Sequence, residues 1–375
     1  MTTTDGAAVA GAVLAGRRVE LLDRARIYAC GITPYDVTHL GHAATFVWVD
    51  TLARTFRALG VAAEVCRNVT DVDDVLDAAA RRAGAAYDTF AAIQQFHFDR
   101  DMAALNVRAP EHEPRAHRYV QQVIRLAAGL LEAGAAYLRS GTVYFRGQDV
   151  AARAGIGETE ALALSREYGD RPENEAKDDP LDVAVWQASE SGHPAWESPW
   201  GPGRPGWHAE CAAMAMSVFG PAVDVHAGGA DLMFPHHAYH AAMAEAFTGV
   251  RPYARAWLHA GTVTIDGAKM AKSAGNLVLL EDLLAAHPAA AVRLMILDRP
   301  WGVSWDYRPE LLTAAAARLE ALYQAAGRID PGSPATGTEL HRLLATDLDV
   351  PAALDLAIEA GGMPARTLAT ILGLT

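Results

Sequence analysis

The sequence predicts an α/β protein with a parallel sheet, an inserted segment and a helical C-terminal region. Strand and helix patterns alternate from residue 25 to about residue 80, and the same alternation returns between residues 209 and 259. Beyond Asn276 the chain is rich in Ala and Leu. Alternating strands and helices favour a parallel sheet, because each helix carries the chain back to the edge where the previous strand began. With 375 residues, 51% of them hydrophobic, the chain can bury one large core and a smaller second one.

The first half of the sheet begins with the buried run at 25–30, which residues 31–34 end. A densely apolar helix follows and closes at Gly60, and a second strand occupies 61–65. The acidic turn at 70–74 then offers capping residues for another helix. Residues 96–146 differ in texture, with a helix at 118–133 and a strand at 141–145, and we interpret them as an insertion.

The second half follows a polar, Pro- and Gly-rich stretch at 147–206, in which only 179–186 has an ordered pattern. Helices at 209–219 and 236–247 alternate with strands at 222–226 and 254–259, and the helical tail has breaks near Pro300 and Pro331. We expect four parts: the first half of the α/β domain at 1–95, an inserted connective domain at 96–185, the second half at 186–283 and a helical bundle at 284–375.

Composition narrows the classes of function. The net charge of −13 argues against general affinity for a phosphate backbone. No apolar run of ~18 residues and no signal-type N-terminus is present, so we expect a cytoplasmic protein without membrane association. Three cysteines, Cys30, Cys66 and Cys211, are too few and too scattered for a disulfide framework, which makes a metal site worth considering.

Lysine is nearly absent, because only Lys177, Lys269 and Lys272 occur among 32 basic residues. Two of them lie three positions apart, with glycines nearby that allow a mobile loop. A charged loop is usually a solvated turn. The scarcity of lysine elsewhere instead favours a segment that needs two compact ammonium charges, as a leaving pyrophosphate would.

The tetrapeptide His39-Leu40-Gly41-His42 lies between the first strand and the helix that it opens. Free N–H groups and the helix dipole favour a phosphate there, and two imidazoles can donate to it. Taken alone, the pattern is weak evidence, because a helix cap plus a core histidine gives the same spacing.

Together the two segments resemble the paired signatures of class I aminoacyl-tRNA synthetases, which implies their Rossmann-like catalytic sheet. Blocks similar to the cysteinyl-tRNA synthetase family occur in family order, at 30–36, 39–42, 70–74, 179–186, 206–211, 228–237 and 269–276. Residues 31–36 and 39–45 are similar to the branch that joins cysteine to glucosaminyl-inositol in mycothiol biosynthesis. The tRNA enzymes usually carry Arg at the position of Ala44 and Lys-Ile in place of Val75-Leu76. Residues 114–116, in contrast, look more like the tRNA enzymes.

The resemblance implies a role for each matched residue. Thr33, His39 and His42 would hold the α-phosphate of ATP, while Lys269 and Lys272 receive the pyrophosphate. The ribose hydroxyls would meet Gly229 and Asp231, and the cysteine would lie beside Thr70 and Trp207. By spacing alone, Asp231 can equally be a helix cap and Trp207 a core residue. ATP would be a substrate that arrives with Mg2+.

The resemblance also implies a zinc ion held by Cys30, Cys211 and His236, with one position left open as in catalytic zinc sites. A substrate thiolate would complete the tetrahedron better than the hydroxyl of serine, which gives selection for cysteine. His240 is a further candidate ligand, because it follows His236 by four residues and stands where the tRNA enzymes carry a Glu ligand. Another departure is Ala271, which replaces the usual Ser of the lysine loop.

We therefore expect an ATP-dependent, AMP-forming ligase that makes cysteinyl-adenylate and transfers cysteine to a small amine, glucosaminyl-inositol in the mycothiol branch. The alternatives are a cysteinyl-tRNA synthetase-like enzyme, a biosynthetic ligase with another amine acceptor, and a non-catalytic sensor of cysteine or adenylate. The retained lysines and histidines speak against the sensor. We expect small-molecule substrates rather than tRNA, and a monomer.

Overall fold

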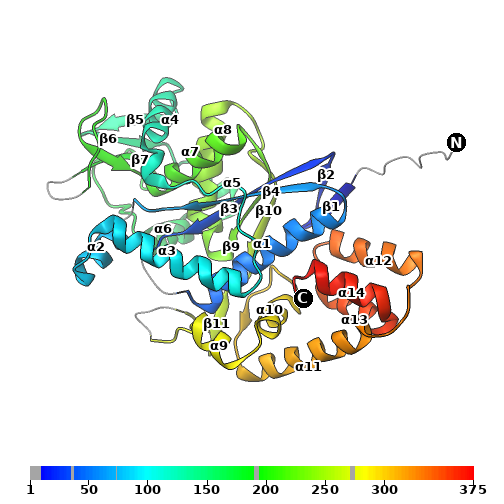
Figure 1. The fold of residues 1–375 in the computed structure, drawn as a ribbon. Coiled ribbons are helices and arrows are strands. Elements are labelled where there is room, and N and C mark those ends of the chain that lie inside the picture. Colours follow the sequence, from blue (N-terminus) through cyan, green and yellow to red (C-terminus); the bar gives the residue numbers. More distant parts are fainter. Residues whose placement is uncertain (1–9, 35–37, 73, 190–193, 271–274) are drawn as a thin grey trace.

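The computed structural model describes residues 10–34, 38–72, 74–189, 194–270 and 275–375. A four-stranded parallel sheet lies at the centre, in the order β10-β9-β3-β4 (Figure 1). Its strands are β3 (Arg24–Ile32), β4 (Ala62–Val69), β9 (Val223–Gly229) and β10 (Ala254–Ala260). The predicted parallel α/β sheet and all four of its strands are confirmed.

Helices cover both faces of this sheet. One face is covered by α1 (Leu40–Ala58), and the other by α7 (Trp207–Phe219) and α8 (Ala238–Thr248). Successive side chains of a strand point to opposite faces, so Ile27 and Ala29 join the core around α1 whereas Tyr28 and Cys30 pack toward α7 and α8. The pleat of β3 therefore decides that the Cys30 thiol lies on the α7/α8 side.

A second, antiparallel sheet, in the order β5-β6-β7-β8, is formed by residues that lie in the sequence between the two halves of the central sheet. Its strands are β5 (Ala136–Arg139), β6 (Thr142–Phe145), β7 (Val183–Ala188) and β8 (Gly203–Pro205), and α4 (Val120–Glu132) packs on it. These elements share their own core, which contains Val123 and Trp186. The sheet continues beyond residue 185 to Pro205, because β8 pairs with β7.

Further helices belong to this part of the chain. The chain forms α2 (Asp74–Ala83) and α3 (Tyr87–Ala104) before α4, and α5 (Val150–Arg153) and α6 (Glu158–Glu167) between β6 and β7. In Figure 1 the antiparallel sheet and α4 stand at one end of the molecule, and the C-terminal helices lie at the other.

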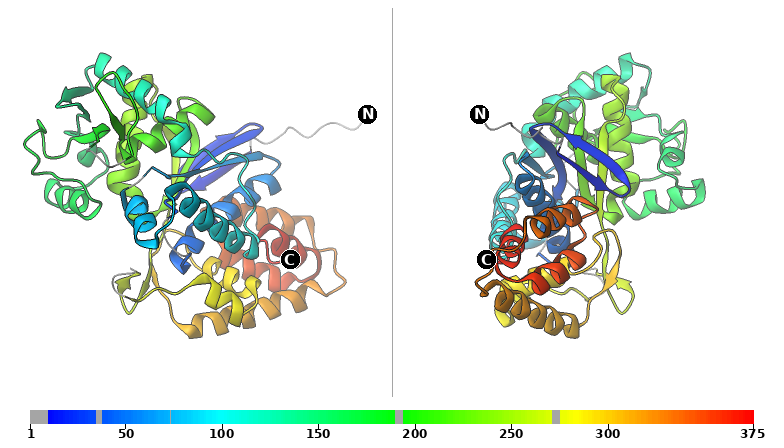
Figure 2. Two further views of the ribbon diagram at one scale, coloured as in Figure 1. Left: turned by 60° about the vertical axis from the view of Figure 1, so that its left-hand side comes forward. Right: turned by 90° about the vertical axis from the view of Figure 1, so that its right-hand side faces the viewer.

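The C-terminal region is helical, as predicted. A small sheet of β11 (Val263–Ile265), β12 (Ala268–Lys269) and β13 (Trp305–Asp306) surrounds α9 (Leu280–Ala286) and α10 (Ala289–Leu297) in sequence. The chain then forms α11 (Pro309–Ala326), α12 (Pro334–Ala345), α13 (Val350–Ala360) and α14 (Gly362–Ile371). The turned views of Figure 2 show these helices packed together beside the sheet domain. Among the described residues, no helix combines the length and the apolar character needed to span a membrane.

A buried arginine ties the helical region to the sheet domain. Arg293 of α10 lies 2.5 Å from the carboxylate of Asp50 in α1, and it donates to the carbonyl oxygens of Leu372 at 2.6 Å and Leu105 at 2.9 Å. Burial lowers the pKa of the guanidinium, but the carboxylate of Asp50 opposes this change and keeps the charge. One side chain thus joins α1, α10, the end of α3 and the C-terminus.

The N-terminal hairpin is an element that the sequence did not predict. Its strands β1 (Ala10–Leu14) and β2 (Arg17–Leu21) pair antiparallel, and Val13 forms a bridge with Thr346 after α12. The Ala- and Gly-rich β1 has little local strand signal, so its long-range partners determine its conformation.

Candidate active site

The predicted residues converge at the carboxyl ends of β3, β4 and β9, where parallel sheets commonly bind ligands. A pocket of about 200 Å³ opens there. Of the residues singled out in the sequence, its lining contains Cys30, Thr33, His42, Thr70, Trp207, Cys211, Gly229, Asp231 and His236. Residues that lie far apart in the sequence thus share one cavity, while Lys272 and Ala271 lie outside the described residues.

The phosphate-facing side of the pocket is the N-terminus of α1. His39 is the N-cap residue, and its Nδ1 accepts a hydrogen bond from the backbone N–H of Gly41 at 3.1 Å. The ring of His42 stacks on it, with centroids 3.8 Å apart. Because Nδ1 accepts, the proton of His39 resides on Nε2, which is therefore a donor. Two imidazoles at the positive end of a 19-residue helix suit an anion.

The pocket lining also contains two hydroxyl groups and an indole. The hydroxyls of Thr33 and Thr70 lie 2.7 Å apart, and Thr70 also donates to the carbonyl oxygen of Ile32 at 3.1 Å. Trp207, the first residue of α7, stacks on His236 with centroids 4.2 Å apart. The indole therefore lies directly beside the cluster of thiols and imidazoles.

The close approach of β3 and β4 depends on Gly31. A Cβ atom at this position would lie 1.6 Å from the carbonyl oxygen of Asn68, so only glycine fits. The backbone N–H of Gly31 donates to the side-chain oxygen of Asn68 at 3.0 Å. This contact fixes the two neighbours of Gly31 in the pocket wall, Cys30 and Ile32.

Lys269, at the end of β12, reaches the pocket from the C-terminal side. Its Nζ lies 2.9 Å from a carboxylate oxygen of Asp231 and 3.4 Å from the hydroxyl of Tyr168. Burial opposes the ammonium charge, but the carboxylate of Asp231 outweighs it and raises the pKa of Lys269. The lysine therefore carries its charge throughout the neutral pH range.

Tyr168 contacts residues of the pocket lining, and sequence reasoning missed it. Its hydroxyl donates to the backbone oxygen of Asp231 at 2.9 Å, and its ring stacks beside Trp207. Burial raises its pKa, and Asp231 adds to this effect. Nothing in the polar stretch around Tyr168 gave a local signal, because the helix that carries it, α6, meets the pocket only in the folded chain.

Two cysteines and a histidine meet beside this pocket. The Sγ atoms of Cys30 and Cys211 and a ring nitrogen of His236 all lie within 4.8 Å of one another, and all three residues are buried. The side-chain amide of Asn68 donates to the Cys211 sulfur at 3.3 Å, and Nδ1 of His208 lies 3.0 Å from Nδ1 of His236. Such supporting contacts orient metal ligands. Asn68 and His208 were not predicted, although His208 stands in the block 206–211 on which the resemblance rests.

The charges of this cluster suit a cation. Burial lowers the pKa of His236, and it lowers the pKa of His208 to about 3, so both imidazoles are neutral. Burial, with Cys211 adding to it, raises the pKa of the Cys30 thiol. Two buried thiols and a neutral imidazole form the donor set that zinc prefers, and a divalent ion would hold the sulfurs as thiolates.

Comparison with known proteins agrees with this geometry. Residues 19–317 match the family described as the catalytic domain of class I (C) tRNA synthetases. The chain belongs to this family. The matched range begins at β2 and ends within α11, so it contains the whole pocket.

Curated relatives of this family member are named L-cysteine:1D-myo-inositol 2-amino-2-deoxy-α-D-glucopyranoside ligase. The relative from Acidothermus cellulolyticus is 43% identical over 341 residues, which cover 89% of this chain and 84% of the relative. The relative from Kineococcus radiotolerans is 44% identical over 360 residues, which cover 92% of this chain and 85% of the relative. The sequence thus falls among ligases, and the chain is a ligase of the class I synthetase family.

Solved structures show the same fold. A Mycobacterium tuberculosis methionyl-tRNA synthetase in complex with methionyl-adenylate has a TM-score of 0.65 at 18% identity, covering 94% of this chain and 82% of that one. A leucyl-tRNA synthetase from Agrobacterium radiobacter K84 has a TM-score of 0.61 at 12% identity, with the same coverage. The class I synthetase fold predicted from the sequence is therefore confirmed.

His240 takes a different place from the three other candidate ligands. It is fully buried, and burial lowers its pKa to about 3. Its donor atoms group with those of Cys30 and His226, within 4.8 Å of one another, and it does not belong to the group formed with Cys211 and His236. His226, on β9, was not predicted as a ligand, although it precedes the block 228–237 by two residues.

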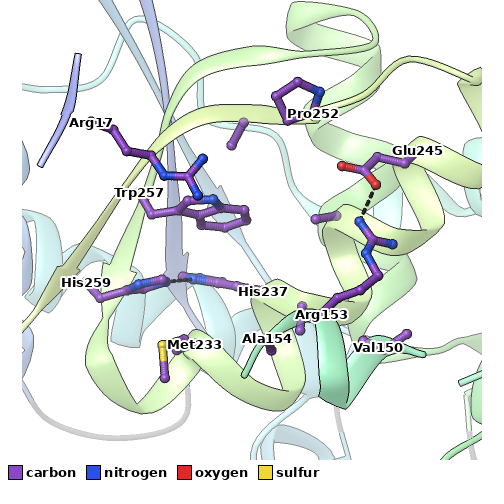
Figure 3. A pocket seen from close by; sticks show the side chains of 13 residues that line it. Arg17, Val150, Arg153, Ala154, Met233, His237, Glu245, Pro252, Trp257 and His259 are labelled. Atoms are coloured by element: carbon purple, nitrogen blue, oxygen red, sulfur yellow. Dashed lines mark hydrogen bonds and ion pairs between the residues drawn. The ribbon is translucent and has the colours of Figure 1, made fainter. Parts of the chain in front are cut away.

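A second pocket of about 380 Å³ lies on the other side of the segment that follows β9 (Figure 3). Leu232 and His236 line the first pocket, whereas Met233 and His237 line the second, so this segment separates them. In Figure 3, Arg17, Trp257 and His259 line one side of this pocket, and Arg153 and Glu245 line the other. The remaining lining includes the ion pair Arg153–Glu245 and the hydrogen-bonded pair His237–His259, at 2.8 Å. None of the residues predicted for the active site lines this pocket.

Proposed function

We propose that the chain activates L-cysteine with ATP and joins it to the amine of 1D-myo-inositol 2-amino-2-deoxy-α-D-glucopyranoside, forming an amide and AMP. The observation that carries this proposal is one pocket whose lining contains both His42, on which His39 stacks, and the cluster Cys30–Cys211–His236. The first group suits a phosphate, and the second suits a thiol. The names of the curated relatives supply the acceptor.

In the first step, a carboxylate oxygen of cysteine attacks the α-phosphorus of ATP, and the bond from phosphorus to the pyrophosphate oxygen breaks. Thr33, His39 and His42 would stabilise the negative charge on the α-phosphate, because the two histidines are donors at the N-terminus of α1 and Thr33 carries a hydroxyl just after β3. Lys269 and Lys272 would offset the charge that the leaving pyrophosphate gains. Catalysis by this arrangement is alignment and charge stabilisation.

In the second step, the acceptor nitrogen attacks the carbonyl carbon of the mixed anhydride. The carbon–oxygen bond to AMP breaks, the amide bond forms, and the nitrogen loses a proton. Gly229 and Asp231 would hold the ribose through this step. Thr70 and Trp207 would hold the cysteine, since they line the wall between the phosphate side and the sulfur cluster.

Cys30, Cys211 and His236 would hold a zinc ion. When bound, zinc supplies a Lewis-acid position that prefers a thiolate over a hydroxyl, which favours cysteine over serine. Asn68 and His208 would orient the Cys211 sulfur and the His236 ring through the contacts described above. We propose further that Mg2+ accompanies the ATP and that the chain acts as a monomer.

The tRNA alternative has no specific support in the described residues. The segment that resembles the tRNA enzymes has a structural role here, because the backbone oxygen of Pro114 accepts from Val69 and Arg115 forms a bridge with the same residue at the edge of β4. The net charge of −13 also disfavours a large anionic partner.

Two assays test the proposal. Cysteine-dependent exchange of labelled pyrophosphate into ATP measures the first step, and serine serves as the competing amino acid. Mass spectrometry of products after incubation with ATP, cysteine and either the amino sugar or bulk tRNA identifies the acceptor. We expect exchange with cysteine and a cysteinyl amide of the sugar. Efficient charging of tRNA would refute the acceptor, and absence of exchange with every amino acid would favour the sensor alternative.

A matched pair of cysteine variants tests the metal. We expect Cys211→Ser to lose both bound zinc and the preference for cysteine over serine. Cys66→Ser should keep both, because Cys66, on β4, is as buried as Cys211 but belongs to neither donor group. Equal zinc content in the two variants would contradict the assignment.

A further inference from the structure

A second group of metal-binding side chains shares Cys30 with the first. Its members are Cys30, His226 and His240, whose ligand atoms all lie within 4.8 Å of one another. The Cys30 sulfur is 3.5 Å from Nε2 of His226. Cys30 is 4% exposed, and both histidines have no exposed surface. The group is therefore enclosed, and the family resemblance suggested zinc-ligand roles for Cys30 and His240 but none for His226.

Polar atoms without partners gather around this group. In the part of the chain that the structure describes, both ring nitrogens of His240 and Nδ1 of His226 have no hydrogen-bond partner, and neither do the hydroxyls of Tyr28 and Tyr253. The rings are close neighbours, because the centroid of His240 lies 4.7 Å from that of His226, 4.8 Å from Tyr253 and 5.4 Å from Tyr28. Each unsatisfied buried polar group costs about 1–3 kcal/mol. A bound cation would take one ring nitrogen of each histidine, so the unpartnered nitrogens of His240 supply a buried donor that such a ligand requires.

The backbone explains why two donor groups share one sulfur. Tyr28 of β3 is paired with His226 of β9, which places His226 beside Cys30, two residues further along β3. His236 follows the backbone kink at Phe234, and His240 lies in the first turn of α8. The two histidines thus approach Cys30 from different directions, with Cys211 beside His236 and His226 beside His240.

We propose that Cys30, His226 and His240 form a second position for a divalent transition-metal cation, represented here by zinc, and that the Cys30 thiolate bridges it to the first position. One thiolate and two neutral imidazoles are borderline-soft donors, which zinc prefers and which Mg2+ and Ca2+ avoid. A thiolate sulfur has enough lone pairs to bind two cations. The inference depends on the proposed zinc site only through the shared Cys30.

The second pocket adjoins this position. His226 contacts Trp257 and His237, with centroids 4.9 Å and 4.3 Å away, and both of these residues line that pocket (Figure 3). The competing occupant is ordered water, which can satisfy the same polar atoms.

Metal stoichiometry of the full chain separates the two occupants. The protein is saturated with Zn2+, freed of excess by gel filtration and analysed by plasma mass spectrometry. We expect two zinc ions per wild-type chain. His226→Ala and His240→Ala should each retain one, and the matched control His259→Ala should retain two, because His259 lies on the same side of the sheet but outside both donor groups.

A titration of the wild type with Co2+ counts the metal positions without a substitution, so its result cannot arise from disturbed folding of a variant. Two equivalents should bind, and the visible bands of tetrahedral cobalt should continue to grow after the first equivalent. In His240→Ala the growth should stop at one equivalent while the sulfur-to-cobalt charge-transfer band persists.

The outcomes also separate this inference from the first zinc site. One ion in the wild type that survives both His226→Ala and His240→Ala overturns the second position and leaves the first intact. One ion that survives Cys211→Ser but not His240→Ala supports the second position and refutes the first.

Discussion

Replacing Lys269 with Ala tests the assignment of the pyrophosphate-binding charge. The side chain is about half exposed and its Nζ lies 2.9 Å from Asp231. An ion pair of this exposure contributes only about 0.2–1 kcal/mol to folding. A positioned charge that meets the leaving group in the transition state contributes more, and its loss slows catalysis by about 10²–10³-fold, which corresponds to about 2.7–4 kcal/mol. The variant should therefore fold normally and react slowly.

Cysteine-dependent pyrophosphate exchange at saturating ATP measures this effect. We expect kcat to fall by about 10²-fold or more. The KM for cysteine should stay within about threefold of wild type, because the ammonium acts on the leaving group rather than on bound cysteine. The matched control is Arg308→Ala, which removes an exposed positive charge that follows β13 in the same small sheet but pairs with Asp306 rather than with Asp231 of the pocket lining. An equal loss in both variants would refute the reasoning, and so would an unchanged kcat with a raised KM in Lys269→Ala.

Three further substitutions test the scaffold. Arg293→Met leaves two buried carbonyl groups without their donor and should lower the free energy of unfolding in urea by about 3 kcal/mol; a change below about 1 kcal/mol contradicts the anchoring role. Gly31→Ala puts a Cβ 1.6 Å from the Asn68 oxygen and should reduce pyrophosphate exchange at least about tenfold, whereas Gly337→Ala, with no atom within 4 Å, should not; equal exchange rates argue against the close approach. Burial lowers the pKa of His259 to about 4, so its contribution to stability is complete above pH 6.5 and is lost as the pH falls toward 4. Between pH 6.5 and 5 this loss is about 2 kcal/mol, which His259→Gln should remove, and parallel stability curves for the two proteins would disprove it.

Local sequence pattern was sufficient for the main architecture. The strands β3, β4, β9 and β10 are short apolar runs between turn residues, and α1 starts where the His39–His42 segment predicted a helix. Such elements can be predicted because a buried strand or helix requires apolar residues at regular positions in the local sequence. The family resemblance then predicted that Cys30, Cys211 and His236 bind one metal ion, and the structure places their donor atoms within 4.8 Å of one another.

Elements that are stabilised by residues distant in the sequence were not predicted. The hairpin of β1 and β2 is stabilised by contacts with β10 and α12, and β8 forms only because it pairs with β7 across 14 residues of connecting chain. Tyr168 reaches Asp231 and Lys269 from a helix of the inserted segment. In each case the stabilising contact is non-local, so the neighbouring residues in the sequence could not predict it.

The sequence alone determined which side chains are available for metal chemistry, and the tertiary structure decided how they are grouped. A spacing of four residues suggested that His236 and His240 share one helical face and one ion. The structure instead groups the donor atoms of His236 with those of Cys211 and the donor atoms of His240 with those of His226, and both groups share Cys30. The register of β3 against β9 then brings His226 to the same sulfur. Strand register and helix start arise from packing of the whole sheet, which is why no local spacing could have grouped His240 with His226.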